Sequence, residues 1–267
     1  MEVIEKEIIY GHRGAIHLYT IGDEHIGTRM FAESKLIDKI TQIKRDPIAY
    51  WIGMGDKAEF ITPHDPRWDV GVIAEWVDQD NIAEDQSERY CDLYTPIIDK
   101  CVGLLGGNHE DAIRTHSHVD VQKNICKKLG VPNLGYSCWV RFRFKQRGGN
   151  AIHIYDGVFT HGSGWAITKG AKMNRLERFM DAFNARLYGH AHVHDIILET
   201  GKAYLDLDAN GHIKQRVKVG ATTGCWFKTY EQGIKASYGE KRGYPPTEIG
   251  CPMFTIFPDK DILKVEG

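Results

Sequence analysis

Five short groups of polar residues, each following an apolar run, carry the side chains that could do chemistry in this 267-residue chain. In chain order they read Asp23-Glu24-His25, Gly55-Asp56, Gly107-Asn108-His109-Glu110, Thr160-His161 and Gly189-His190-Ala191-His192. Together they supply two aspartates, one asparagine and five histidines. Such oxygen and imidazole ligands suit divalent cations, and two cations about 3.5–4 Å apart can clamp the oxygens of a phosphoryl group. The set therefore predicts a two-metal hydrolytic site.

These groups need a scaffold that brings them together, and strand ends provide one because loops converge there on one edge of a rigid sheet. Residues 7–23 are predicted to form a hairpin that turns at residues 12–14 and delivers Asp23 at a strand end. Apolar spacing predicts helices over residues 31–45, 117–129 and 169–183. Strands mixed with helices, then a later run of strands, predict two packed sheets flanked by helices.

Composition narrows the class of protein. Hydrophobic residues make up 42% and charged residues 26%, which is ordinary for a globular domain. The net charge of −2 gives no global attraction to nucleic acid, so such binding would need a local basic patch. No apolar stretch is long enough to cross a bilayer, and the first residues lack the apolar region of a secretory signal. Six widely spaced cysteines without a C-x-x-C pair favour free thiols, so we expect a cytoplasmic protein with no membrane partner.

The five groups resemble the motifs of the calcineurin-like metallophosphoesterases. That family has Asp-x-His, Gly-Asp-x-x-Asp, Gly-Asn-His-Asp/Glu, a single His and Gly-His-x-His, and the match here runs from Asp23 to His192. The resemblance implies an α/β fold, a four-layer α/β/β/α sandwich with a dinuclear metal site at one edge of the two sheets. Against this pattern the chain is a single domain, 1–267, with an insertion at 57–99 and an irregular C-terminal segment at 223–267.

The resemblance also assigns ligands, position by position. The first metal would be held by Asp23, His25, Asp56 and His192. The second would be held by Asp56, Asn108, His161 and His190, so that Asp56 bridges the two ions. His109 would face the substrate as a catalytic proton donor. No cysteine stands at a ligand position, so manganese (Mn²⁺) is the first choice of metal, with Fe, Zn and Ni as alternatives.

Two positions near these motifs need separate interpretation. Glu59 stands where the family usually has Asp, and its longer carboxylate could still support His109, because such histidines often need a carboxylate partner. Glu59 is therefore grouped with His109 as a catalytic candidate. His194 follows the last motif closely and is interpreted as a solvent or strand histidine.

The favoured function is a metal-dependent phosphoric ester hydrolase in which a metal-bridging hydroxide attacks the phosphorus. A phosphodiesterase or nuclease acting on nucleotides or nucleic acid is preferred, because aromatic and basic residues that could stack bases and pair phosphates flank the motifs. The candidate substrate contacts are Arg67, Trp68, Trp76, Trp226 and Lys228.

Other interpretations stay open at this stage. The residues around Trp68 also suit an amphipathic helix on the core, and the segment after Cys225 could rim the site or wrap the surface. The basic strand from Arg141 to Lys145 reads as the solvated face of an edge strand, with a phosphate-binding patch as the alternative. A phosphomonoesterase acting on protein or small molecules is the second enzyme hypothesis, and a non-catalytic binding module is the third. Nothing in the sequence assigns an oligomeric state.

Overall fold

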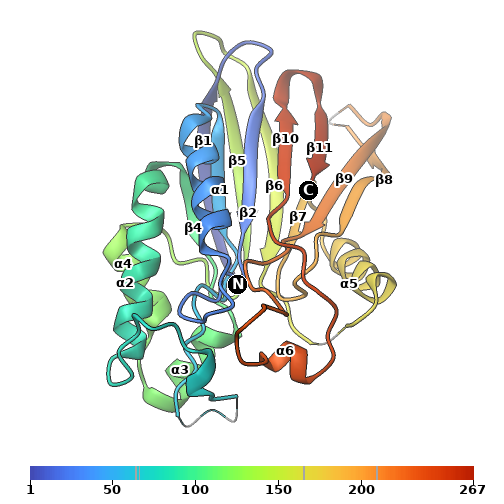
Figure 1. The fold of residues 1–267 in the computed structure, drawn as a ribbon. Helices are drawn as coiled ribbons and strands as arrows, with labels where there is room; N and C mark the ends of the chain where they lie inside the picture. Colours follow the sequence, from blue (N-terminus) through green and yellow to red (C-terminus); the bar gives the residue numbers. More distant parts are fainter. Residues whose placement is uncertain (64, 66, 165, 209) are drawn as a thin grey trace.

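Two β-sheets and six α-helices make up the fold in the computed structural model, which describes residues 1–63, 65, 67–164, 166–208 and 210–267 (Figure 1). The six-stranded sheet has the order β1 (Glu2–Tyr10), β5 (Ser137–Gln146), β6 (Ile152–Thr160), β7 (Leu187–His190), β9 (Ile213–Thr222), β8 (Leu198–Leu207). The five-stranded sheet has the order β11 (Ile262–Glu266), β10 (Met253–Phe257), β2 (Ile16–Ile21), β3 (Ala49–Gly53), β4 (Cys101–Leu104).

The helices connect and cover these strands. They are α1 (Glu33–Arg45), α2 (Ile82–Tyr94), α3 (Asn108–Ser117), α4 (Val121–Leu129), α5 (Lys169–Ala182) and α6 (Tyr238–Lys241), with short 3-10 turns at Val70–Val72, Thr95–Lys100 and Pro258–Lys260. In α1, the buried residues Leu36, Ile40 and Ile43 recur at helical spacing, which gives one apolar face. A basic last turn in the same helix complements the negative end of its dipole.

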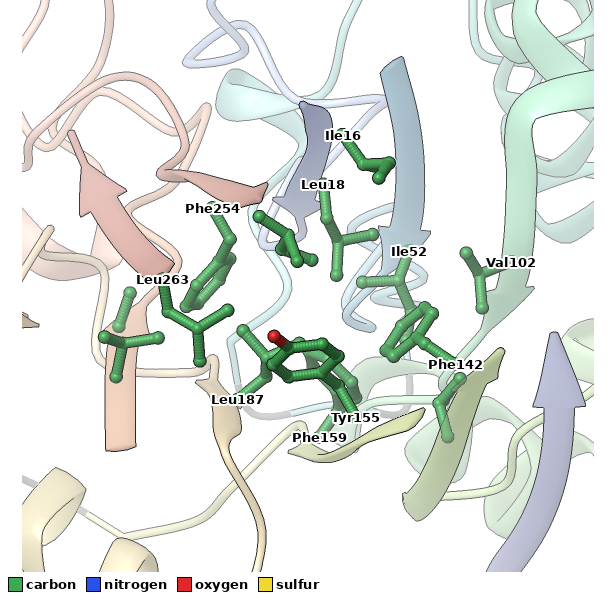
Figure 2. Close-up of a cluster of buried hydrophobic side chains, with 14 of the residues drawn as sticks. Ile16, Leu18, Ile52, Val102, Phe142, Tyr155, Phe159, Leu187, Phe254 and Leu263 are labelled. Carbon is green, nitrogen blue, oxygen red and sulfur yellow. The ribbon is translucent and has the colours of Figure 1, made fainter. Parts of the chain in front are cut away.

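Three buried clusters hold the layers together. The largest lies between the two sheets and contains side chains from both, among them Leu18, Ile52, Phe142, Phe159, Leu187 and Phe254 (Figure 2). A second cluster packs α1, α2 and α4 onto the other face of the five-stranded sheet. A third packs Leu176 and Met180 of α5 against Val158 and Tyr188 of the six-stranded sheet. Because side chains alternate along a strand, Leu187 faces the other sheet while Tyr188 faces α5.

Strand direction positions the site. β2, β3 and β4 run parallel, and so do β6, β7 and β9. The carboxyl ends of parallel strands meet at one edge of a sheet, so the loops after β2, β3, β4, β6 and β7 open at the same end. The short helices α3 and α6 lie at that end in Figure 1.

The predicted N-terminal hairpin is wrong, although Asp23 does follow a strand end. β1 pairs in parallel with β5 in the six-stranded sheet, whereas β2 lies between β10 and β3 in the other sheet. Ile8 of β1 and Leu18 of β2 both belong to the cluster between the sheets, so the two strands contribute to the core from opposite sheets. The turn between them crosses from one sheet to the other, and a turn sequence alone does not distinguish these arrangements.

Other local predictions change in detail. The helix expected at 117–129 begins only at Val121, as α4. Ser117 is the last residue of α3, His118 follows it with φ +55°, and Asp120 caps α4 by accepting from the Lys123 N–H at 2.9 Å. β5 is not an edge strand, because β1 flanks it on one side and β6 on the other. Its basic residues are nevertheless exposed or half-buried, and Arg141 pairs with Asp156 of β6 at 2.9 Å.

All six cysteines are buried free thiols. Among the described residues, we find no helix with the length and apolar character that crossing a membrane requires.

Candidate metal centre

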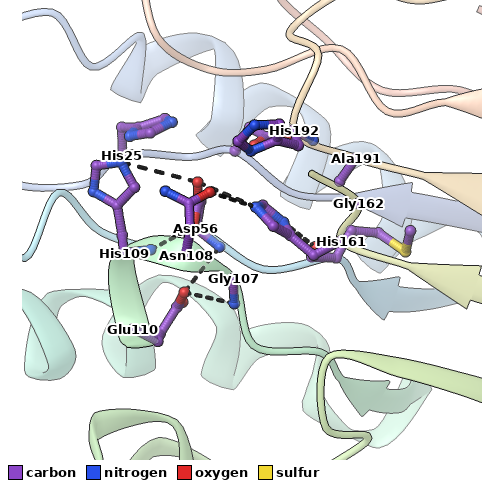
Figure 3. A network of polar contacts seen from close by, with 12 residues as sticks. His25, Asp56, Gly107, Asn108, His109, Glu110, His161, Gly162, Ala191 and His192 are labelled. Carbon is purple, nitrogen blue, oxygen red and sulfur yellow. Dashed lines mark hydrogen bonds and ion pairs between the residues drawn. The ribbon is translucent and has the colours of Figure 1, made fainter. Parts of the chain in front are cut away.

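The predicted ligand residues converge where the strands end. Asp23 and His25 follow β2, Asp56 follows β3, and Asn108 and His109 open α3 after β4 (Figure 3). His161 follows β6, and His192 follows β7. Asp23, His25 and Asp56 have φ values of +53°, +51° and +52°, a left-handed conformation that costs non-glycine residues about 1–3 kcal/mol and is typical of functional sites.

A buried carboxylate locks two of these strand ends together. Glu110 accepts hydrogen bonds from the backbone N–H groups of Asp56 (3.1 Å), Lys57 (3.0 Å) and Gly107 (2.8 Å) (Figure 3). The buried Lys57 ammonium lies 3.2 Å from Glu110 and also donates to Gln122 at 2.5 Å. Burial, the largest single effect, raises the pKa of the Glu110 carboxyl, but the Lys57 charge, the Lys57 backbone hydrogen bond and His161 together lower it. The loops carrying Asp56 and Asn108 are therefore held in one geometry.

Asp56 lies at the centre of the candidate site. Its Oδ1 accepts from the backbone N–H of His109 at 2.9 Å, and its Oδ2 lies 3.3 Å from His161 Nε2. Asp56 belongs to two groups of ligand atoms that lie within 4.8 Å of one another, one with His25 and His109 and the other with His161 and His192. A Cβ on Gly107 would lie only 2.1 Å from Asp56 Oδ1, so this close approach requires glycine there.

Around His161, hydrogen-bond acceptors face one another. Its Nδ1 lies 2.9 Å from the Met54 carbonyl and so carries a proton, and Nε2 is an acceptor unless a second proton or a metal binds there. That Nε2 points at Asn108 Oδ1 (3.1 Å) and Asp56 Oδ2 (3.3 Å), both of which are also acceptors. Burial, the largest single effect, lowers the pKa of His161, but the Asp56 carboxylate, Asp23 and the Met54 carbonyl together raise that pKa to about 10, so a metal-free ring holds a second proton on Nε2. A divalent cation at the meeting point would replace the second proton, so these residues fit a metal.

A second set of acceptors surrounds Asp23. Its Oδ2 accepts from the His192 N–H (2.9 Å) and the Thr223 hydroxyl (3.2 Å), whereas its fully buried Oδ1 has no hydrogen bond. His25 Nδ1 bonds to the Glu59 carboxylate at 2.9 Å, which directs the lone pair of His25 Nε2 inward. His194 Nε2 lies 3.2 Å from His25 Nε2 and 3.4 Å from Asp23 Oδ1. These three residues form another group of ligand atoms within 4.8 Å, which also fits a cation.

His109 has different partners from those predicted. Its Nδ1 bonds to the backbone carbonyl of Glu59, while the Glu59 carboxylate bonds to His25. The prediction that the Glu59 carboxylate supports His109 is therefore wrong, because the chain turns at this residue, with φ +45° at Phe60, and presents the carbonyl to one ring and the side chain to the other. Glu59 orients a candidate metal ligand.

Arg67 reaches the site from the predicted insertion, as expected for a substrate contact. Its Nη1 lies 3.1 Å from His109 Nε2. Asp65 fixes the guanidinium by accepting from Nε at 3.0 Å and from Nη2 at 2.7 Å. A held guanidinium next to a candidate metal site is well placed to bind phosphate oxygens.

A cavity of about 400 Å³ opens beside these groups. The candidate ligands and Arg67 form one wall, and Ile167 and Val193 form another. The rest comes from the C-terminal segment, which contributes Phe227, Tyr238, Tyr244, Pro245 and Pro246. The C-terminal segment therefore rims the site and is not simply a surface wrap.

The other nominated substrate contacts lie elsewhere. Trp68 lines a smaller adjacent cavity of about 150 Å³. Trp76 is 43% exposed and lines neither cavity. Trp226 is buried in the helix-side core, where its backbone N–H donates to the Asp23 carbonyl at 2.9 Å, so the prediction that it binds substrate is wrong. Lys228 pairs with Glu231 at 2.7 Å and lines neither cavity. Phe227, which lies between Trp226 and Lys228, and later residues of the segment line the larger cavity instead.

The structure also revises the last motif. His190 is absent from the three ligand groups formed by the described residues, and His194, interpreted as a solvent or strand histidine, joins one of them. The signal for His194 was present in the sequence, because His190, His192 and His194 alternate. Spacing alone does not tell which two of the three turn inward.

Comparisons with known proteins find similarity among solved structures. No protein-family model and no curated protein matches the chain. A metallophosphoesterase from Sphaerobacter thermophilus is 12% identical, with 94% of this chain and 87% of that chain covered and a TM-score of 0.39. A conserved uncharacterized protein from Streptococcus pneumoniae TIGR4, described as a predicted phosphoesterase, is 11% identical, with 91% and 84% covered and a TM-score of 0.35.

Proposed function

We propose that this chain is a divalent-metal-dependent phosphoesterase that cleaves phosphodiesters of nucleotides or nucleic acid. The observation that carries the proposal is the buried cluster around Asp56, where Nε2 of His161 faces the oxygens of Asn108 and Asp56. These atoms can lie so close together only if a proton or a cation lies between them. The neighbouring Asp23 Oδ1 is likewise a buried acceptor that has no hydrogen bond. The proposal includes a dinuclear site at the edge of a four-layer, single-domain sandwich, with Mn²⁺ as the first metal to test.

Each group then has a chemical role. Asp56 would bridge two cations, with Asn108 and His161 on one side and Asp23 and His25 on the other. Two bound divalent cations would supply Lewis acidity, which activates water and offsets charge on the phosphoryl oxygens. Arg67 would hold a non-bridging phosphate oxygen by a charge-assisted hydrogen bond.

His109 would protonate the leaving oxygen, and its contacts determine which ring nitrogen can carry the proton. Nδ1 is committed to the Glu59 carbonyl, so the transferred proton must come from Nε2. In the structure Nε2 faces Arg67 Nη1 and accepts from it. Arg67 must therefore turn from His109 to the substrate phosphate before His109 can carry a proton on Nε2 and donate it.

The cavity supports a nucleotide as the substrate unit. Its volume of about 400 Å³ lies in the range of small-ligand pockets, roughly 300–1,000 Å³. Phe227, Tyr238 and Tyr244 offer flat rings on which a base can stack. The rim residues thus take over the role predicted for Trp226.

The test is a substrate panel measured with Mn²⁺ and with chelator. It contains bis(p-nitrophenyl) phosphate, p-nitrophenyl phosphate, cyclic nucleotides, single- and double-stranded DNA, and RNA. We expect metal-dependent cleavage of the diester and of nucleotides, and no cleavage by Asp56→Asn. Faster cleavage of the monoester would replace the diester assignment with a phosphomonoesterase. Activity that survives both chelator and Asp56→Asn would refute the proposal.

A further inference from the structure

Three alternating histidines, His190, His192 and His194, begin at the last residue of β7, and the proposed site has ligand positions for two of them. The family motif assigns those positions to His190 and His192, leaving His194 outside. From the geometry we infer that His192 and His194 are the ligands and that His190 is a packing residue. The ligand pair is then displaced by two residues from the pair that the motif assigns. This inference rests on the proposed two-metal function and concerns which residues of this chain build the site.

His190 is already committed to the sheet. It is the last residue of β7 and pairs in register with Thr160 of β6 and Thr222 of β9. Its Nδ1 lies 2.8 Å from the carbonyl of Ala191, and its ring packs edge-on against Phe179 of α5 at 5.8 Å. Tyr188, two residues earlier on the same face of the strand, belongs to the α5 cluster. The strand therefore turns His190 towards α5.

His192 faces the ligand group of Asp56 and His161. Its ring centroid lies 5.3 Å from that of His161 (Figure 3), and the ligand atoms of all three residues lie within 4.8 Å of one another. His192 Nδ1 is buried and has no hydrogen-bond partner. A buried ring nitrogen without a partner, beside a carboxylate and an imidazole, is what the second metal position requires.

His194 completes the other group. Its Nε2 lies 3.4 Å from Asp23 Oδ1, the fully buried oxygen that has no hydrogen bond, and 3.2 Å from His25 Nε2. The His194 side chain is 26% exposed and lines the cavity, so a cation held there would be accessible to substrate. The first metal would then have Asp23, His25, Asp56 and His194, and the second would have Asp56, Asn108, His161 and His192.

The loop that carries His194 is fixed on both sides. Its next residue, Asp195, forms a buried ion pair with Lys172 of α5 at 2.6 Å. The Ile196 N–H donates to Glu248 of the C-terminal segment at 2.9 Å, and the His192 N–H donates to Asp23. These contacts hold His194 over Asp23.

Metal content tests the assignment without an activity assay. The full chain is stripped with chelator, loaded with Mn²⁺, freed of excess metal, and its bound manganese is measured per chain by mass spectrometry and its affinity by calorimetry. We expect two ions in the wild-type protein. His194→Ala should weaken the binding of one ion by about 10–100-fold or more, because loss of even a supporting partner costs that much metal affinity. His190→Asn, the matched control, should keep both.

The outcomes separate the inference from the proposed function. Two ions bound at wild-type affinity in His194→Ala, or a lost ion in His190→Asn, overturns the displaced pair but leaves a two-metal enzyme. No bound metal in the wild-type chain overturns the proposed function itself.

A measurement on the wild-type chain covers the case in which His190→Asn does not fold. Diamagnetic Zn²⁺ should shift the ring ¹⁵N resonances of His192 and His194 in NMR spectra and leave those of His190 in place. A metal-dependent shift at His190 with none at His194 contradicts the inference.

Discussion

At Asp56, one carboxylate serves two groups of candidate ligands, and its neighbours show how closely the site is determined. The His109 N–H holds one oxygen, the Glu110 carboxylate holds the Asp56 backbone, and Gly107 leaves room for the contact. Because Lys57 balances Glu110 in the core, the buried charge that builds this geometry has a partner. Removing Lys57 would leave a buried carboxylate unpaired beneath the site.

The first prediction at the residue scale concerns His109. His109→Gln should keep two bound metals, because His109 is proposed to face the substrate and not to bind a metal. Its kcat should fall by about 10²–10⁴-fold, the usual share of general acid catalysis, and less for substrates with good leaving groups. Steady-state rates across a series of substituted phenyl diesters measure this. Equal losses across the series would exclude the acid role.

The second prediction concerns Arg67. Arg67→Ala should lower kcat/KM for phosphodiesters by about 10-fold or more, since it removes a charge-assisted hydrogen bond to the phosphate. Arg67→Lys should recover only part of the loss, because an ammonium cannot pair with Asp65 through two nitrogens and still reach the phosphate. Trp76→Ala, in the same insertion but outside the cavity, is the control and should match the wild type. An unchanged kcat/KM in Arg67→Ala would remove Arg67 from the site.

At the scale of elements, two segments far apart in sequence are joined beside the cavity. Asp69 of the insertion accepts from Lys235 at 2.8 Å and from Lys241, in α6, at 2.9 Å. Residues next to these lysines, including Tyr238, line the cavity. The insertion and the C-terminal segment therefore depend on each other for their placement.

The third prediction tests this connection. Asp69→Asn keeps an acceptor for the Gly71 N–H but loses both ion pairs. Hydrogen exchange should become faster over residues 230–245, and KM for nucleotides should rise while metal content stays constant. Glu231→Gln, which breaks the Lys228 pair in the same segment, is the control. Unchanged exchange would show that the ion pairs do not hold the segment.

The same pair of contacts has a defined pH dependence. The hydrogen bond from Lys235 and then that from Lys241 lower the pKa of Asp69 well below its ordinary value. A carboxyl whose pKa is lowered by folding contributes stability above its unfolded pKa, about 3.9, and loses it as the pH falls through the folded pKa. The difference in exchange between wild type and Asp69→Asn should stay constant from about pH 8 to pH 5 and shrink only below about pH 4. A difference that disappears near pH 6 would point to a histidine instead.

At the scale of the whole molecule, the candidate ligands join the two sheets. Asp23, Asp56 and Asn108 follow strands of the five-stranded sheet, whereas His161 and His192 follow strands of the six-stranded sheet. Bound cations would therefore link the layers at one end of the core. The cluster of apolar side chains between the sheets links them along the rest of their length.

The fourth prediction follows from this link. Mn²⁺ should raise the thermal unfolding midpoint, because a ligand that binds only the folded state stabilises it by about 2.7 kcal/mol at 100 times its Kd. Chelator should reverse the shift. Asp56→Asn, which lacks the shared ligand, should show a much smaller shift in calorimetry. A metal-induced shift of equal size in Asp56→Asn would place the stabilising site elsewhere.

The sequence by itself determined the types, order and strand-end positions of the candidate ligands. Each lies in a short motif directly after an apolar strand, so local patterns were sufficient for Asp23, Asp56, Asn108 and His161. The free cysteines and the helices near 31–45 and 169–183 followed from composition and periodicity in the same way. These features depend on neighbours in the chain, which a sequence displays.

Only the tertiary structure decided how distant segments meet. β1 does not pair with β2 as predicted, because its apolar face is buried by pairing with β5 in the other sheet. No local turn signal encodes that choice. The Glu59 carboxylate bonds to His25, and Phe227 and later residues form the rim, because packing across the site set those positions. For His190, His192 and His194 the spacing is the same throughout. The extent of β7 and the place of α5 determine which rings face inward, since a strand residue must point to one face or the other.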